Sequence, residues 1–202
     1  MFLLLFLVAG LAAGRLAGGS FLRLARLPAR FLWLAPLALA LQAAVFWHVF
    51  EDAAGSADII AGLYLFSLEL LLLCVLLNVR LPGVKLLGVG LLLNFTVIAA
   101  NGGYMPVSLP RLEQVGMEDE AQKLREQEHH LNVTAMADHT RLRFLGDFIP
   151  VPEPLPLRSV YSVGDVLIAA GGFWLICGGM TMGVRGRRRA ASGQAPVAPL
   201  TR

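Results

Sequence analysis

The chain has 202 residues, of which 56% are hydrophobic and 15% are charged, and its mean hydropathy is +0.66. Soluble domains carry about 25% charged residues, so this composition excludes an ordinary water-soluble domain and indicates a membrane protein. The formal net charge is +3, but the basic residues flank apolar runs instead of forming one patch, which argues against nucleic acid as a partner.

Five apolar segments are long enough, or nearly long enough, to cross a bilayer, which takes about 20 residues in a helix. In chain order they cover residues 2–18, 31–50, 59–79, 86–100 and 160–182. No positive residue precedes the first segment, which is wrong for a cleaved signal peptide, so we expect this segment to remain as a membrane helix. The sequence therefore predicts an all-α membrane protein with five transmembrane helices.

Basic residues mark one side of this predicted bundle. The loops after the first and third segments and the C-terminal tail together carry eleven basic residues and no acid. By the positive-inside rule this side is cytoplasmic, so the N-terminus lies outside and the C-terminus inside. The predicted parts are a four-helix transmembrane part (1–100), an extracytoplasmic cap (101–157), a fifth transmembrane helix (158–184) and a basic, disordered cytoplasmic tail (185–202).

The predicted cap has a pattern of its own. Gly102 and Gly103 end the fourth apolar segment, as glycines commonly end helices. Charged residues at helix spacing predict a helix over about 108–130, and we expect a second short helix over 131–145. The alternating prolines of 150–156 predict an extended, polyproline-like strap that leads back to the membrane. Together these signals predict a compact helical and Pro-rich cap.

Three motifs occur in order in this part of the chain: NGGYMPVS, DHTRLRFLGDFIPVP and VYSVGDVLIAAGGFWLI. In this combination the sequence resembles a family of small bacterial multi-pass membrane proteins, a domain of unknown function. The resemblance implies a bacterial cytoplasmic (inner) membrane location and transfers no catalytic role. The positions that carry it are Asn101, Gly102, Gly103, Met105, Pro106, Gly146, Asp147, Pro150, Ser162, Gly164 and Asp165.

Polar side chains inside the apolar segments are the first functional candidates, because an ionisable group at the bilayer centre costs about 2.5–3.5 kcal/mol. Gln42, Glu69 and Asn94 lie near the middle of the second, third and fourth segments. We expect them to form one intramembrane hydrogen-bonded cluster. Such a cluster is either structural, holding the helices together, or part of a proton or substrate pathway.

A second set of candidates lies toward the outer ends of the helices. Asp165 comes a few residues into the fifth segment, where its carboxylate can cap the helix or reach the turn that ends the fourth segment. Our hypothesis is one outer pocket under the cap, lined by Asn101, Gly102, Gly103, Asp147, Asp165, His48 and His139. The alternative is that these residues only tie the cap to the bundle through turns, caps and single hydrogen bonds.

Histidines near acidic residues raise the question of a metal. His129, His130 and His139 lie close in sequence to Glu126 and Asp138, but their spacing matches no zinc pattern. The sequence therefore predicts no metal site, and it assigns no cofactor.

Two functions of different class fit these observations. The first is an accessory or binding protein that recognises a membrane lipid or a partner membrane protein through the cap. The second is a small membrane-embedded enzyme or carrier whose outer pocket uses Asp165, Asp147 and Asn101. We favour the first, because the sequence holds no complete set of nucleophile, base and oxyanion donors.

Overall fold

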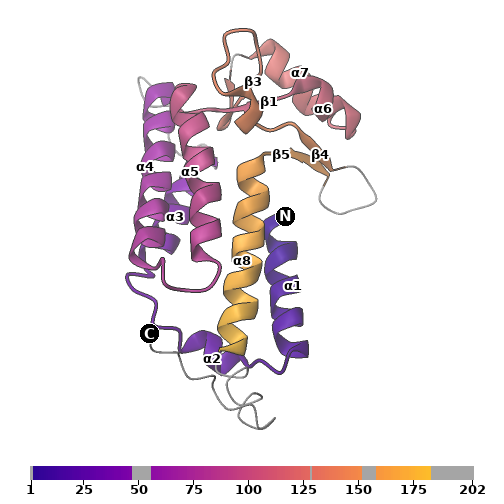
Figure 1. Cartoon of the computed structure of the whole chain (residues 1–202). Coiled ribbons are helices and arrows are strands. Elements are labelled where there is room, and N and C mark those ends of the chain that lie inside the picture. Colours follow the sequence, from indigo (N-terminus) through magenta and orange to yellow (C-terminus); the bar gives the residue numbers. More distant parts are fainter. Residues whose placement is uncertain (1, 47–55, 128, 152–157, 183–202) are drawn as a thin grey trace, which may run out of the picture.

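The structure is a computed structural model that describes residues 2–46, 56–127, 129–151 and 158–182 (Figure 1). It is mostly helical, and its five longest helices form one bundle. Each lies largely within one of the apolar segments that the sequence predicts. These helices are α1 (Phe2–Leu16), α3 (Leu34–Phe46), α4 (Ser56–Leu77), α5 (Val84–Ala100) and α8 (Val163–Thr181).

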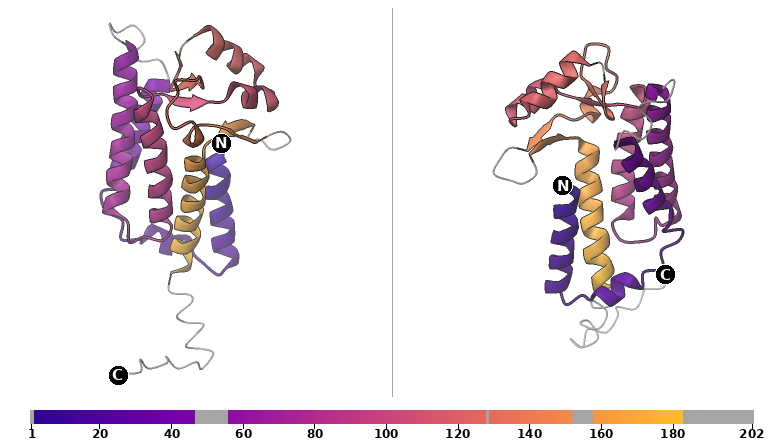
Figure 2. Two further views of the ribbon diagram at one scale, coloured as in Figure 1. Left: turned by 45° about the horizontal axis from the view of Figure 1, so that its top comes forward. Right: turned by 180° about the vertical axis from the view of Figure 1, so that it is seen from behind.

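The five helices pack in an order that differs from their order in the chain. The last helix, α8, lies between α1 and α5, while α4 contacts α5 and α3 (Figure 2). Glycines permit these close approaches: a Cβ atom added at Gly90 would lie 2.5 Å from the carbonyl oxygen of Gly164, and one added at Gly171 would lie 2.4 Å from the backbone nitrogen of Leu87. Small residues therefore let the backbones of α5 and α8 touch.

An α/β segment (residues 101–161) covers one end of these helices (Figure 1). Its strands form two small sheets: β1 pairs parallel with β3 and β3 pairs antiparallel with β2, while β4 and β5 form an antiparallel pair. Outside this segment, a short helix, α2 (Phe21–Ala25), lies in the loop after α1. The elements of the α/β segment are β1 (Met105–Val107), α6 (Leu109–Gln114), α7 (Glu118–Glu126), β2 (His129–His130), β3 (Val133–Ala135), the 3₁₀ helix η1 (Arg143–Leu145), β4 (Ile149–Val151) and β5 (Ser159–Tyr161).

This segment corrects two expectations from the sequence. The helix expected over 108–130 is divided into α6 and α7, because Gly116 adopts a left-handed backbone conformation (φ 75°). The helix expected over 131–145 does not form, because β3 pairs with β1 in that region. The chain is therefore not all-α: short strands hold the α/β segment together. Most of the expected proline strap and the whole of the expected tail lie outside the described residues.

The α/β segment has its own apolar core and a second cluster that joins it to the helices. Its core consists of Val107, Leu112, Val115, Ala121, Leu124 and Val160, all buried. In the second cluster, Met105 of β1 packs with Leu68 of α4 and with Val97 and Ile98 of α5. The segment is therefore packed onto the ends of α4 and α5.

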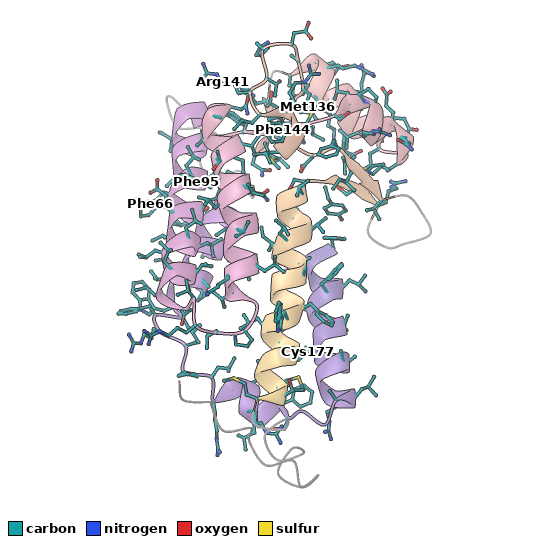
Figure 3. All side chains as sticks on the ribbon, in the orientation of Figure 1. Phe66, Phe95, Met136, Arg141, Phe144 and Cys177 are labelled. Carbon is teal, nitrogen blue, oxygen red and sulfur yellow. The ribbon has the colours of Figure 1, made fainter. Side chains whose placement is uncertain are left out.

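Two of the helices contain stretches that are long and apolar enough to cross a bilayer: Ile59–Leu77 and Val163–Thr181, each with 19 residues. The apolar helices α1, α3 and α5 are shorter. Many large apolar side chains of all five helices are exposed, and Phe66 projects outward from α4 in Figure 3. These features suggest an association with a membrane. The exposed side chains include Leu4, Val8, Leu37, Leu39, Phe66, Leu73, Leu76, Val89, Leu92, Val166 and Trp174.

Candidate functional site

The start of α8 is closed by a reciprocal hydrogen-bond pair. The hydroxyl oxygen of Ser162 accepts from the backbone N–H of Asp165 at 3.0 Å, and Asp165 Oδ2 accepts from the backbone N–H of Ser162 at 3.0 Å. This is a capping box, with Asp in the position usually held by Glu. One oxygen of the Asp165 carboxylate therefore satisfies the helix terminus.

Asn94 of α5 completes this arrangement from the neighbouring helix. Its amide nitrogen donates to Asp165 Oδ1 at 2.8 Å, and its amide oxygen accepts from the Ser162 hydroxyl at 3.0 Å. Ser162 is fully buried and Asn94 is 8% exposed. Both carboxylate oxygens of Asp165 are thus occupied, and the three side chains lock α5 to α8.

Asp147 lies near this trio, between η1 and β4. Its backbone is paired on both sides, because its N–H donates to the carbonyl of Pro106 at 2.8 Å and its carbonyl accepts from the N–H of Ser108 at 2.9 Å. Its Oδ1 is enclosed and has no hydrogen-bond partner among the described residues. Burial, and then the carboxylate of Asp165, raise the pKa of Asp147 well above its usual range.

Aromatic residues border the two carboxyl groups. Tyr161 of β5 stacks on Phe2 with ring centroids 4.4 Å apart, and burial, followed by the charge of Asp165, raises the pKa of its hydroxyl. We call Asn94, Asp147, Tyr161, Ser162 and Asp165 the polar junction. It holds two carboxyl groups. Both oxygens of the Asp165 carboxyl group accept hydrogen bonds, whereas Oδ1 of Asp147 has no partner among the described residues.

A separate pocket of about 510 Å³ opens in the α/β segment beside the end of α5. We call it the basic pocket. None of its lining residues is acidic, whereas two arginines and two histidines contribute to it. It is lined by Ala100, Asn101, Leu124, Arg125, Gln127, His129, Thr134, Ala135, His139, Thr140 and Arg141.

Asn101, the residue that follows α5, fixes one rim of the basic pocket. Its amide nitrogen donates to the carbonyls of Val97, at 2.8 Å, and Arg141, at 2.9 Å, while its amide oxygen accepts from the N–H of Arg141 at 3.0 Å. The next residue, Leu142, adopts a left-handed conformation (φ 52°) that Leu disfavours. The backbone of Arg141 is therefore held from both sides at a strained turn, near the end of α5 (Figure 3).

The basic side chains that line the basic pocket differ in their contacts with the rest of the protein. Arg125 of α7 forms an ion pair with Glu113 of α6, and the ring of His129 stacks on Tyr104 with centroids 3.8 Å apart. Within the described ranges, the exposed side chain of Arg141 has no ion pair or hydrogen bond. A guanidinium group on a fixed backbone, beside further cationic and hydroxyl side chains, suits a phosphate or carboxylate ligand.

Residues 26–177 match the DUF5317 family, which is described as a family of unknown function. The chain belongs to this family. The DUF5317 chain is also 33% identical, over 107 residues, to an uncharacterised protein of Thermotoga maritima. That alignment covers 53% of the chain and 58% of the relative. No solved structure matches the chain.

The structure divides the predicted outer pocket of this DUF5317 protein into two places. Asn101 and His139 line the basic pocket, whereas Asp147 and Asp165 belong to the polar junction. Two further members, Gly102 and Gly103, form the turn after α5 with φ of 71° and 95°. A Cβ atom added at Gly103 would lie 2.5 Å from that of Ala61, so this glycine allows α4 to approach the turn. His48 lies outside the described residues.

The predicted cluster of Gln42, Glu69 and Asn94 does not form. Gln42 donates to the hydroxyl of Ser67 at 3.1 Å, and Asn94 is engaged in the polar junction. The side chain of Glu69 is exposed, because two residues along a helix rotate it by about 200° from the face of Ser67. Hydropathy alone does not determine which face of such an apolar helix turns toward which neighbour.

Sequence reasoning missed the basic pocket as a unit. Arg125 and Arg141 come together through the β2–β3 pairing. The sequence predicted a helix over 131–145 in place of this pairing. The sequence held a weak signal that Arg141 lacks an acidic partner. Asp138 is the one acid three or four residues from Arg141 in the sequence, and its carboxylate lies 3.9 Å from Arg143 instead. In the part of the chain that the structure describes, no group of three His, Cys, Asp or Glu side chains could hold a metal ion.

Proposed function

We propose that this DUF5317 protein is a multi-pass membrane protein of the bacterial cytoplasmic membrane that binds a phosphate-bearing ligand in the basic pocket. In this proposal the five apolar helices span the bilayer, the N-terminus is outside, and the α/β segment is an extracytoplasmic cap. The protein then acts as an accessory or binding protein and not as an enzyme. The observation that carries the proposal is an acid-free, arginine-bearing pocket on a segment that is otherwise rich in acids.

The exposed apolar surface supports the membrane part of the proposal. Large apolar side chains are exposed on all five helices, and water would penalise a surface of this extent. The charges agree with this orientation, since the loops at the far end from the α/β segment carry basic residues and no acid. Phe144 of η1, 67% exposed, is suited to the level of the lipid headgroups, beside Arg141 and Arg143.

The hydrogen bonds of the polar junction favour binding over catalysis. Asp165 uses both carboxylate oxygens to close α8 and to hold Asn94, and Asn101 uses its amide to clamp the backbone of Arg141. A general base or a metal ligand needs a free lone pair directed at its substrate. Two of the three residues that the enzyme hypothesis needs, Asp165 and Asn101, are therefore engaged in structural contacts.

The test is ligand binding by the full chain with a matched pair of arginine variants. Binding of inorganic phosphate, of a soluble phosphodiester and of phosphatidylglycerol in nanodiscs is measured by calorimetry on the purified protein. Arg141→Gln should weaken binding about tenfold or more, since a hydrogen bond to a charged group contributes about 1.5–3 kcal/mol. Arg143→Gln, two residues away and outside the pocket lining, should bind like the unaltered protein.

The three ligands separate the possible sources of the phosphate. Tight binding of the nanodisc lipid alone would identify a lipid headgroup, whereas binding of the soluble phosphates would identify a free anion. Equal affinities of the two variants, or no binding of any of the three by the unaltered protein, would contradict the proposal.

One observation favours a second candidate, a small membrane carrier. The Oδ1 atom of Asp147 is enclosed and lacks a hydrogen-bond partner among the described residues, and the carboxyl group lies close enough to Asp165 for that charge to raise its pKa. Groups perturbed in this way are frequent at proton-transfer sites. If ligand binding is coupled to a proton at Asp147, calorimetry in buffers of different ionisation enthalpy will detect proton exchange that Asp147→Asn abolishes. A binding protein will show no such exchange.

A further inference from the structure

A second pocket lies at the end of the helices opposite the α/β segment. It has a volume of about 840 Å³ and is formed by the turn between α4 and α5, the first turns of α5, and the side of α8. We call it the inner groove. It is lined by Val79, Arg80, Leu81, Gly83, Lys85, Leu86, Val89 and Trp174.

The two cations of the inner groove are not neutralised by any residue that the structure describes. Arg80 and Lys85 are exposed, and neither side chain has a hydrogen bond or an ion pair with another described residue. The sequence contains no acid between residues 70 and 112, and none after Asp165, which lies in the first turn of α8 at its opposite end. None of the residues that line the groove is acidic. The groove therefore presents two positive charges that no described residue neutralises.

Two other basic residues at the same end, Arg15 and Arg23, have side chains that contact the fold. Arg23 donates to the carbonyl of Met180, near the end of α8, at 3.1 Å, and Arg15 donates to the carbonyl of Gly19 at 3.2 Å. Such contacts satisfy carbonyl groups that a helix end leaves free. Arg80 and Lys85 differ from these two arginines, because neither side chain has such a contact with a described residue.

The rest of the groove is apolar. Leu81 and Leu86 form its walls, and Val89 and Trp174 are 50% and 58% exposed. Val89 lies one helical turn after Lys85, about 6 Å further along α5 in the direction of the α/β segment. The positive charges are thus at the mouth of the groove, and its apolar walls continue along the helices.

A phospholipid has the same division into a phosphate and a hydrocarbon chain. A free phosphate would use the cations but not the apolar walls, and an apolar ligand would leave the cations unpaired. Trp side chains favour the boundary between headgroups and hydrocarbon, which agrees with the place of Trp174 beside the charged mouth. Basic residues at the cytoplasmic surface attract anionic lipids.

We propose that the inner groove binds one anionic phospholipid of the cytoplasmic leaflet. Its phosphate lies between Arg80 and Lys85, and an acyl chain lies along Val89 and Trp174. This site is distinct from the basic pocket, and it rests on the membrane orientation given under Proposed function.

The fluorescence of Trp174 provides a local test. In a Trp33→Phe/Trp47→Phe background, Trp174 is the remaining tryptophan, and its quenching is measured after reconstitution with brominated phosphatidylglycerol or brominated phosphatidylcholine. From two basic residues at the surface, we expect the anionic lipid to bind at Trp174 about tenfold more tightly than the zwitterionic lipid. In the Arg80→Gln/Lys85→Gln variant, the two lipids should bind at Trp174 with about equal affinity.

The control removes the same charge elsewhere at this end. Arg26→Gln/Arg30→Gln replaces two exposed side chains that do not line the groove, and it should retain the preference. Equal quenching by both lipids in the unaltered groove, or an equal loss of preference in both double variants, would overturn the lipid site. Absence of quenching by either lipid would instead contradict the membrane insertion itself.

Discussion

Gly164 is the position at which the packing of the polar junction can be tested most directly. A Cβ atom there would lie 1.8 Å from Asn94 Oδ1 and 2.8 Å from the carbonyl oxygen of Gly90. Gly164→Ala must therefore displace Asn94 and break its hydrogen bonds to Ser162 and Asp165. These bonds contribute about 0.5–1.5 and 1.5–3 kcal/mol, and forcing a methyl group into a packed interface costs a further 1–3 kcal/mol or so. The expected loss of stability is roughly 3–7 kcal/mol.

Thermal unfolding in detergent, followed with a thiol-reactive dye, measures this loss because Cys74 is buried in the folded chain. At about 2–4 °C per kcal/mol for a chain of this length, a loss of this size corresponds to a fall in Tm of roughly 6–28 °C. Gly62→Ala is the matched control, since no atom lies within 4 Å of a Cβ added at this exposed position in α4. It should raise stability by up to about 1 kcal/mol through helix propensity. Equal Tm values for the two variants would refute the reasoning.

Two further predictions concern stability. Asp147 has a folded-state pKa above its unfolded value, so its contribution to stability is complete below about pH 3.9 and is lost as the pH rises toward the folded-state pKa. Asp147→Asn should therefore be more stable than the unaltered protein at pH 7–8, with a Tm difference that shrinks toward pH 4; a constant difference would contradict the shift. Asn78 donates to the carbonyls of Arg30 and Cys74 and accepts from the N–H of Arg30. Asn78→Ala should lower stability by about 2–4 kcal/mol in the same unfolding assay, and an unchanged Tm would show that these bonds contribute little.

The positions of the long helices could be predicted from their apolar runs, and two of the helix ends from local signals. Gly102 and Gly103 mark the end of α5, and the spacing of Ser162 and Asp165 marks the start of α8. Such signals act over three or four residues, so the sequence displays them directly.

The strands and the partners of the polar residues could not be predicted in the same way. The pairing of β1 with β3 joins residues that are far apart in the chain, and Leu131 and Leu142 adopt left-handed conformations without the Gly or Asn that usually signals them. Asn94 was expected to meet Gln42 because both lie at similar depth. Its true partners depend on the rotation of α5 toward α8, which an apolar helix leaves unspecified in the sequence.

The position of α8 between α1 and α5 has a consequence for the synthesis of the chain. Helix α1 is synthesised before α3, α4 and α5 but packs chiefly against α8, so the glycine-lined contacts of α1 stay unmade until α8 has been synthesised. During this time α3, α4 and α5 can pair with one another without waiting, since they are consecutive. The five helices can therefore come together only when α8 inserts between α5, already packed with α3 and α4, and α1. A ribosome that stalls before residue 163 leaves α1 without its main packing partner.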